Sequence, residues 1–136
     1  MAVETLAGAE SREGPELGAE VKAAAEAYCV ALQSGDVAGL RVLFAPGAHL
    51  YAADGDAVAD LPRDAWLERV AARSMTPPSS GFAIELLDVS GPETAVARVL
   101  VGVGPRVYRD YLSFLKVGGS WQVIAKVYRL VQGPAA

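Results

Sequence analysis

The feature that most constrains the fold is a series of strand-like segments in the second half of the chain. They cover residues 82–89, 94–103, 107–117 and 121–130. β-Branched and aromatic residues are frequent in them, and short glycine-containing turn sequences separate them. Strands joined by such turns pair with their neighbours in the sequence, so this part of the chain predicts an antiparallel meander.

The first half of the chain predicts helices instead. Apolar residues recur at three- and four-residue steps over residues 17–32, which is typical of a helix with one buried face. Gly35 ends this helix, and Asp36 caps a second, short one. A short strand at 48–53 and a third helix at 62–74 follow. Because the helices come first and the sheet last, we expect an α+β domain in which helices pack on one face of a curved antiparallel sheet.

Composition restricts the class of protein. The 136 residues are 52% hydrophobic, which is sufficient for one domain with its own core. Residues 1–15 are small and acidic, so we expect a disordered lead-in before a single domain at 16–132. The net charge of −4 argues against nucleic-acid binding. With a single cysteine, Cys29, and no phosphate-binding glycine motif, neither a metal nor a cofactor is expected. The sequence contains no apolar run that could span a membrane and no secretory signal, so we expect a cytoplasmic protein.

The short turns also predict which residues share a face of the sheet, because side chains alternate along a strand. The expected pairs at the turns are Val89 with Thr94, Val103 with Arg106, and Val117 with Ser120. The resulting apolar face carries Phe82, Ile84, Leu86, Ala95, Ala97, Val99, Val101, Tyr108, Leu112, Phe114, Trp121, Val123, Ala125 and Val127. The other face is mixed and carries Glu85, Leu87, Val96, Arg98, Leu100, Arg109, Tyr111, Ser113, Ile124, Lys126 and Tyr128.

Asp110 is the unusual residue on the predicted apolar face. The register places Val99 opposite it on one side and Val127 on the other. A carboxylate among such neighbours is costly unless it is paired or hydrated. One interpretation is a structural ion pair with Arg129, which is diagonal to Asp110 on the same face. The other is a carboxylate that lines a ligand pocket and acts as a general base.

The other candidates for a pocket are aromatic side chains and the single histidine. Tyr28 lies on the core face of the first helix, where it either packs in the core or offers its hydroxyl to a ligand. His49 and Tyr51 face the same way on the short strand. Trp66 and Trp121 suit either core packing or a surface for a ligand ring. The candidate pocket residues are therefore Tyr28, His49, Tyr51, Trp66, Tyr108, Asp110, Trp121 and Arg129.

Two stretches of sequence resemble a known superfamily. The stretch AAEAYCVALQSGDVAGLRVLFAP resembles the opening helices of nuclear transport factor 2-like proteins, and DYLSFLKVGGSWQVIAKVYRL resembles their terminal hairpin. The closing Asp-Tyr, Trp and Lys-Val-Tyr are most similar to the lumazine-binding-like and polyketide-cyclase-like branch. The resemblance covers roughly residues 17–131. One departure is Ala45, which precedes Pro46 where a histidine is expected; His49 lies three residues beyond this proline.

The resemblance implies a cone-shaped, cystatin-like fold with a pocket between helices and sheet, and a homodimer formed through the outer sheet face. The first hypothesis is a domain that binds a small apolar molecule. The second is an isomerase, dehydratase or cyclase that uses Asp110 as general base on an apolar carbonyl compound, in the way similar ketosteroid isomerases and polyketide cyclases use a pocket aspartate. The third is a non-catalytic dimerisation module. Exposed Tyr111, Ile124 and Tyr128 on the mixed face favour the homodimer.

Overall fold

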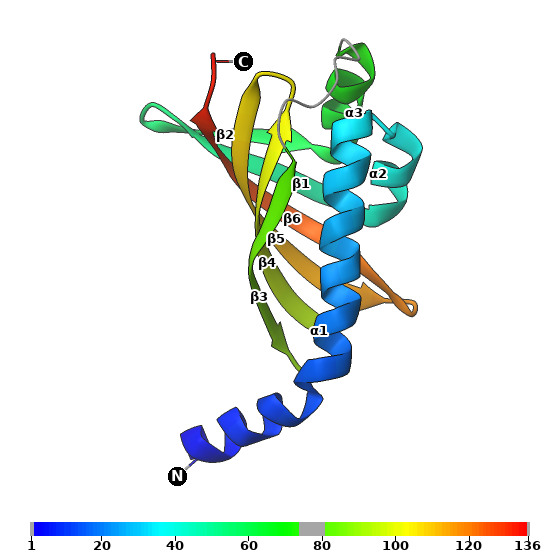
Figure 1. Cartoon of the computed structure of the whole chain (residues 1–136), viewed down its shortest axis with the longest axis vertical. Helices are drawn as coiled ribbons and strands as arrows, with labels where there is room; N and C mark the ends of the chain where they lie inside the picture. Colours follow the sequence, from blue (N-terminus) through cyan, green and yellow to red (C-terminus); the bar gives the residue numbers. More distant parts are fainter. Residues whose placement is uncertain (1, 74–80, 136) are drawn as a thin grey trace.

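A computed structural model describes residues 2–73 and 81–135, with side chains from Glu16 onwards. Three helices cover one face of a six-stranded sheet (Figure 1). In chain order the elements are α1 (Ala2–Ser34), α2 (Val37–Leu43), β1 (Phe44–Asp54), β2 (Ala57–Pro62), α3 (Arg63–Ala72), β3 (Phe82–Ser90), β4 (Thr94–Val103), β5 (Arg106–Val117) and β6 (Ser120–Gln132). This arrangement confirms the α+β class and the predicted meander of β3 to β6.

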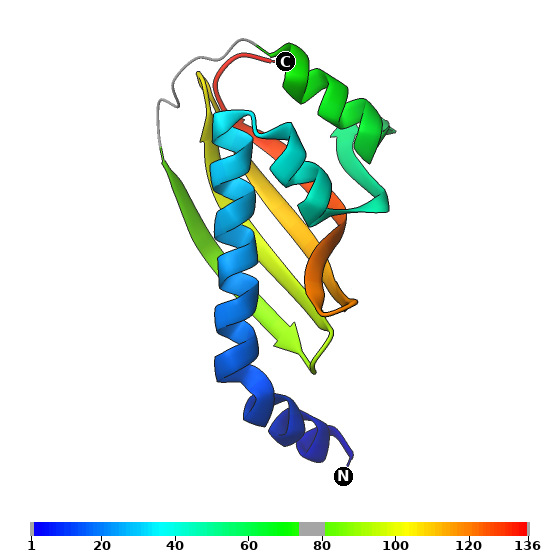
Figure 2. The same cartoon turned by 90° about the vertical axis from the view of Figure 1, so that its right-hand side faces the viewer.

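The strand order of the sheet is β2-β1-β6-β5-β4-β3. All neighbouring strands are antiparallel except β1 and β6, which are parallel. Figure 2 shows α1 lying across the sheet, with α2 and α3 beside it at one end. Neither β2 nor the pairing of β1 with β6 was predicted from the sequence. A parallel pair has no connecting turn to reveal it, because its strands are joined by a long crossover.

The apolar stripe of α1 packs on the inner face of the sheet. Val21, Ala25, Tyr28 and Leu32 are all buried, as their spacing predicts. Gly35 ends the helix with a φ of 69°, a conformation that favours glycine. The predicted cap of α2 is also present, since the Asp36 carboxylate accepts a hydrogen bond from the backbone N–H of Gly39 at 2.9 Å. The local signals for both helix ends are therefore correct.

The start of α1 differs from the sequence prediction. The helix begins at Ala2, whereas residues 1–15 were expected to be a disordered lead-in. This part of α1 projects beyond the sheet in Figures 1 and 2. Side chains are described only from Glu16, and Met1 lies outside the described residues. The expectation that residues 1–15 contribute little to the stability of the domain at 16–132 stays a prediction.

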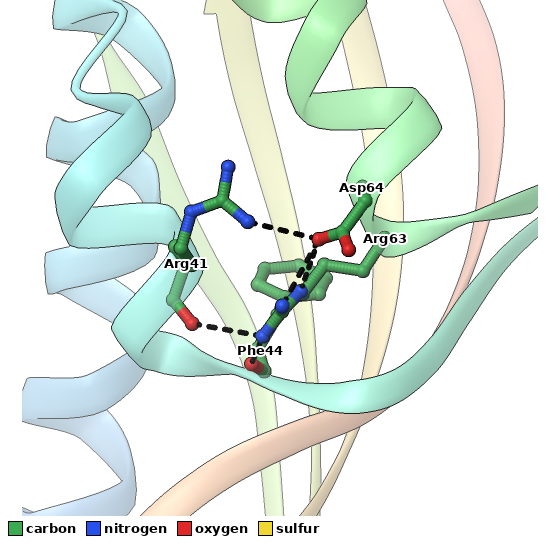
Figure 3. A network of polar contacts seen from close by, with 4 residues as sticks. All are labelled: Arg41, Phe44, Arg63 and Asp64. Atoms are coloured by element: carbon green, nitrogen blue, oxygen red, sulfur yellow. Dashed lines mark hydrogen bonds and ion pairs between the residues drawn. The ribbon is translucent and has the colours of Figure 1, made fainter.

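An arginine network fixes α3 against the end of α2 (Figure 3). The Arg63 guanidinium donates to the backbone carbonyls of Arg41 and Phe44, at 3.3 and 3.2 Å. Arg63 and Arg41 both bind the Asp64 carboxylate at 2.9 Å. Exposed ion pairs add little stability by themselves, but the two carbonyl contacts connect the first turn of α3 to the residues where α2 passes into β1. This junction holds Phe44 and Trp66 in contact, with ring centroids 4.8 Å apart.

A β-bulge in β6 changes the face on which its later residues lie. The expected pairs Val103–Arg106 and Val117–Ser120 are present. The register then shifts by one residue, because Phe114 pairs with Val123 and Ser113 pairs with Ala125. Ile124 is the extra residue. Beyond it the faces exchange: Lys126 and Tyr128 lie on the inner face, and Ala125, Val127 and Arg129 lie on the outer face. The prediction had each of these five residues on the opposite face.

The β3–β4 pair contains a second bulge, at Glu85. Ser90, rather than Val89, pairs with Thr94, and the register shifts between Ile84 and Leu86. The predicted pair of Val89 with Thr94 is therefore wrong. Leu87 packs against the core and Leu86 is exposed, which reverses the prediction for these two residues. Glu85 and Arg98, which were both predicted on the mixed face, form an ion pair at 3.3 Å.

Candidate functional site

The bulge in β6 brings three polar side chains together inside the apolar core. Tyr28 comes from α1, Asp110 from β5 and Lys126 from β6. The Tyr28 hydroxyl donates a hydrogen bond to Oδ2 of Asp110. Nζ of Lys126 donates to the Tyr28 hydroxyl oxygen at 2.8 Å and lies 3.6 Å from the same Oδ2. Tyr28 and Asp110 are fully buried and Lys126 is 5% exposed. We call these three residues the Tyr–Asp–Lys cluster.

Aromatic rings surround the ammonium group of Lys126. Its Nζ lies 4.7 Å from the ring centroid of Trp66, 5.3 Å from that of Tyr28 and 5.2 Å from that of Tyr128. Such rings attract a cation through their negative faces, most strongly where water is absent. The positive charge of Lys126 is therefore balanced by the Asp110 carboxylate and by the three rings.

Oδ1, the second carboxylate oxygen of Asp110, is buried and has no hydrogen-bond partner among residues 16–73 and 81–135, whose side chains the structure describes. All the contacts of this carboxylate within the cluster go to Oδ2. A buried acceptor without a donor costs about 1–3 kcal/mol, and more when it is charged. Oδ1 is thus a hydrogen-bonding position that a donor from a ligand or a water molecule would satisfy.

Burial also sets the protonation of the groups around Asp110. It raises the pKa of Tyr28 well above the usual range, and the neighbouring Asp110 charge adds to this effect. The same two causes raise the pKa of Cys29 to about 12. Burial lowers the pKa of Lys126, and the Asp110 charge opposes this shift. The Tyr28 hydroxyl and the Cys29 thiol therefore keep their protons at neutral pH, and Tyr28 acts as a hydrogen-bond donor.

Of the other residues predicted for the site, some lie beside the cluster. Trp66 contacts Lys126, as described above. Tyr108 is half-buried, two residues before Asp110 on the same face of β5, and its ring is 6.2 Å from that of Tyr128. Trp121 is buried, but its Nε1 donates to Glu20 at 2.8 Å near the β5–β6 turn, five residues before Lys126. Trp121 therefore anchors α1 to the sheet away from the cluster.

The two predicted pocket residues of β1 lie on the outer face instead. His49 and Tyr51 alternate with the buried residues Ala48 and Leu50 of β1 and so face away from the helices. Nδ1 of His49 is 2.5 Å from the Asp60 carboxylate of β2, and its ring stacks on Tyr51 at 6.0 Å. These two side chains therefore form a surface contact between β1 and β2 and take no part in the cluster.

Arg129 is exposed and pairs with Arg109 in the sheet register. Of the two interpretations of Asp110, the ion pair with Arg129 is therefore wrong, and Lys126 is the partner that sequence reasoning missed. One signal pointed to an error in the register: the predicted apolar face offered Asp110 no partner directly opposite it. A bulge that moved Lys126 to the inner face, opposite Leu112, would have supplied a cation diagonal to Asp110.

The side chains of residues 16–73 and 81–135 include no group of three or more His, Cys, Asp and Glu placed to hold a metal ion. No helix in the same residues is long and apolar enough to cross a membrane.

Known proteins with similar structures share this fold. A nuclear transport factor 2-like protein of unknown function from Silicibacter pomeroyi is 27% identical, with a TM-score of 0.75 over 85% of this chain and 97% of that chain. A cystatin-like fold protein from Burkholderia xenovorans gives 20% identity and a TM-score of 0.69, over 88% and 95% of the two chains. A ketosteroid isomerase-like protein from Erwinia carotovora atroseptica gives 21% identity and a TM-score of 0.68, over 84% of this chain and 95% of that chain. The last two likenesses, at such low identity, concern the fold alone.

Sequence comparison gives the family. No curated protein matches the chain. The family model described as "Putative lumazine-binding" matches residues 17–129, a range that includes all three residues of the Tyr–Asp–Lys cluster. The chain therefore belongs to this lumazine-binding family, within the nuclear transport factor 2-like superfamily.

Proposed function

We propose that the domain binds a small, flat, mostly apolar molecule between its helices and the inner face of the sheet. The observation that carries the proposal is the buried, unpartnered Oδ1 of Asp110. An N–H or O–H group of the ligand donates to this oxygen. The rings of Trp66, Tyr108 and Tyr128 supply apolar surface near it. Small-molecule sites commonly combine such an apolar lining with a few polar groups that fix the orientation of the ligand.

The description of the family suggests a first ligand to test. Lumazine is a flat bicyclic ring with N–H donors and carbonyl acceptors. An N–H group of this kind matches Oδ1 of Asp110, and a carbonyl group matches the ammonium of Lys126. These two complementary contacts support the choice of a fused heteroaromatic ring, with lumazine as its simplest example.

A fluorescence titration with lumazine tests the proposal. We expect saturable binding to the native protein and about tenfold weaker binding to Asp110→Asn, because a neutral amide oxygen accepts a hydrogen bond less strongly than a carboxylate. The matched control is Asp88→Asn, which makes the same change at an exposed position of β3. The proposal fails if lumazine does not bind, or if the two variants bind it equally well.

A second candidate function is proton transfer, with Asp110 as general base on an apolar carbonyl compound. It is favoured by the same oxygen: Tyr28 and Lys126 hold Oδ2, which leaves the lone pairs of Oδ1 free to accept a proton. Exchange of the α-protons of a cyclic ketone with D₂O, followed by NMR, measures this activity. Exchange that is catalysed by the native protein and by Asp88→Asn, but not by Asp110→Asn, would establish it. No exchange above the buffer rate would leave binding as the function.

A further inference from the structure

The Tyr–Asp–Lys cluster is nearest to solvent at one end of β5. Leu112, Asp110, Tyr108 and Arg106 lie on the inner face at two-residue steps, with their cross-strand neighbours on β4 buried. Leu112 and Asp110 are fully buried, whereas Tyr108 and Arg106 are half-buried. A ligand that reaches Oδ1 of Asp110 therefore has its outer end near Arg106.

A second arginine approaches this end from α3. Arg73 is the C-cap residue of α3, where the chain leaves the helix in an extended conformation, and its backbone N–H donates to the carbonyl of Val70. Its Nη2 donates to the backbone carbonyl of Leu32 at 2.8 Å. Leu32 is one helical turn beyond Tyr28, about 6 Å along α1. Arg73 therefore extends the side of the site formed by Tyr28 and Trp66 towards solvent.

Both arginines lack a carboxylate partner among the side chains of residues 16–73 and 81–135. Arg73 donates to the Leu32 carbonyl, and Arg106 donates to the carbonyls of Pro134 and Ala135 at 3.0 and 3.2 Å. The negative charge of Asp110 is neutralised by Lys126. The two guanidinium groups therefore leave an excess of positive charge at the end of β5 where the cluster is nearest to solvent. Burial and the charge of Arg106 lower the pKa of Arg73, as expected for a cation without a counter-ion. We call Arg73 and Arg106 the arginine rim.

We propose that the arginine rim binds an anionic group of the ligand, and that Arg73 determines this specificity. The ligand class is then an amphiphilic anion: a flat apolar ring whose N–H or O–H donates to Asp110, with a carboxylate, sulfonate or phosphate group at the rim. A guanidinium suits such a group because its N–H donors match two oxygens at once. This inference rests on the proposed function, since it concerns the outer end of the same ligand.

Two related dyes provide the test. N-phenylnaphthylamine is an apolar, neutral ring system with one N–H donor, and anilinonaphthalene sulfonate adds a sulfonate to the same framework. Both become fluorescent in apolar sites, so their affinities are measured by titration of the full chain. We expect Arg73→Gln to weaken binding of the sulfonate dye about tenfold, as the loss of a charge-assisted contact implies, and to change binding of the neutral dye less than about twofold. Arg73→Lys keeps the charge and should retain most of the preference for the sulfonate dye.

The control is Arg129→Gln, which removes the same charge from the outer face and should alter neither affinity. The inference is overturned if Arg73→Gln changes both dyes equally or neither, or if Arg129→Gln is the variant that weakens the sulfonate dye. If in those cases the neutral dye still binds the native protein, and binds Asp110→Asn less well, the proposed function remains intact. If neither dye binds the native protein, the inference fails, whereas the proposed function is decided separately by the lumazine titration. Thermal melts of all variants show that each protein is folded when it is titrated.

Discussion

Replacement of Lys126 by methionine should be among the most destabilising single substitutions in this domain. The variant keeps most of the length of the side chain but removes the ammonium group, so Asp110 remains buried with only Tyr28 as its partner. At the observed 3.6 Å, two unit charges attract by roughly 5 kcal/mol at an effective dielectric constant of about 20. Breaking a buried pair typically costs about 3–5 kcal/mol. For a chain of 136 residues this corresponds to a fall in melting temperature of about 10 to 17 °C.

Chemical denaturation and thermal melts of three further variants complete this experiment. Arg129→Met is the matched control: it removes a cation three residues further along β6, on the outer face, and should cost less than about 0.5 kcal/mol. Asp110→Asn and the double variant Asp110→Asn/Lys126→Met close a double-mutant cycle, in which the double variant should be more stable than the sum of the single losses predicts. The account is refuted if Arg129→Met destabilises as much as Lys126→Met, or if the two cluster substitutions are additive.

Three further predictions concern the outer face, the N-terminus and alkaline pH. The outer face exposes Tyr111, Ile124 and Val127 beside the ion pairs of Glu85, so we expect sedimentation at micromolar concentration to show a homodimer; a monomer would contradict this. Deletion of residues 1–15 should leave the melting temperature within a few degrees, and a large fall would mean that this part of α1 packs on the domain. The pKa of Cys29 is about 12 in the folded protein and about 9 when unfolded, so at alkaline pH the folded state retains a proton that the unfolded state loses. The free energy of unfolding should therefore fall between about pH 9 and 11, by roughly 2 kcal/mol more in the native protein than in Cys29→Ala. Urea denaturation of both proteins at several pH values measures this difference.

The parts of the fold that sequence reasoning obtained correctly have local causes. The apolar spacing from Val21 to Leu32, the cap at Asp36 and the turn at Gly118 each involve residues close together in the chain. Asp110 was correctly placed opposite Val99, because the β4–β5 turn sets that register without interruption. Such features follow from helix periodicity and turn geometry, which a single sequence displays.

The parts that were missed depend on contacts distant in the sequence. The bulge at Ile124 places Lys126 beside Asp110 and Tyr28, which lies 98 residues away from it. No turn residue marks this bulge, and its benefit appears only when the buried charges are considered together. The same is true of β1, which pairs with β6 across most of the chain. His49 was misassigned for this reason, since its face depends on that pairing.

Native mass spectrometry tests most directly the central claim that the domain holds a small molecule through Oδ1 of Asp110. The native protein, Asp110→Asn and Asp88→Asn would be incubated with the same cell extract, desalted, and weighed under non-denaturing conditions. We predict that the native protein and Asp88→Asn retain a common small molecule, which collisional activation releases for identification, and that Asp110→Asn retains much less of it. Native protein that carries no bound molecule, or an equal amount of the same molecule on Asp110→Asn, would contradict the claim.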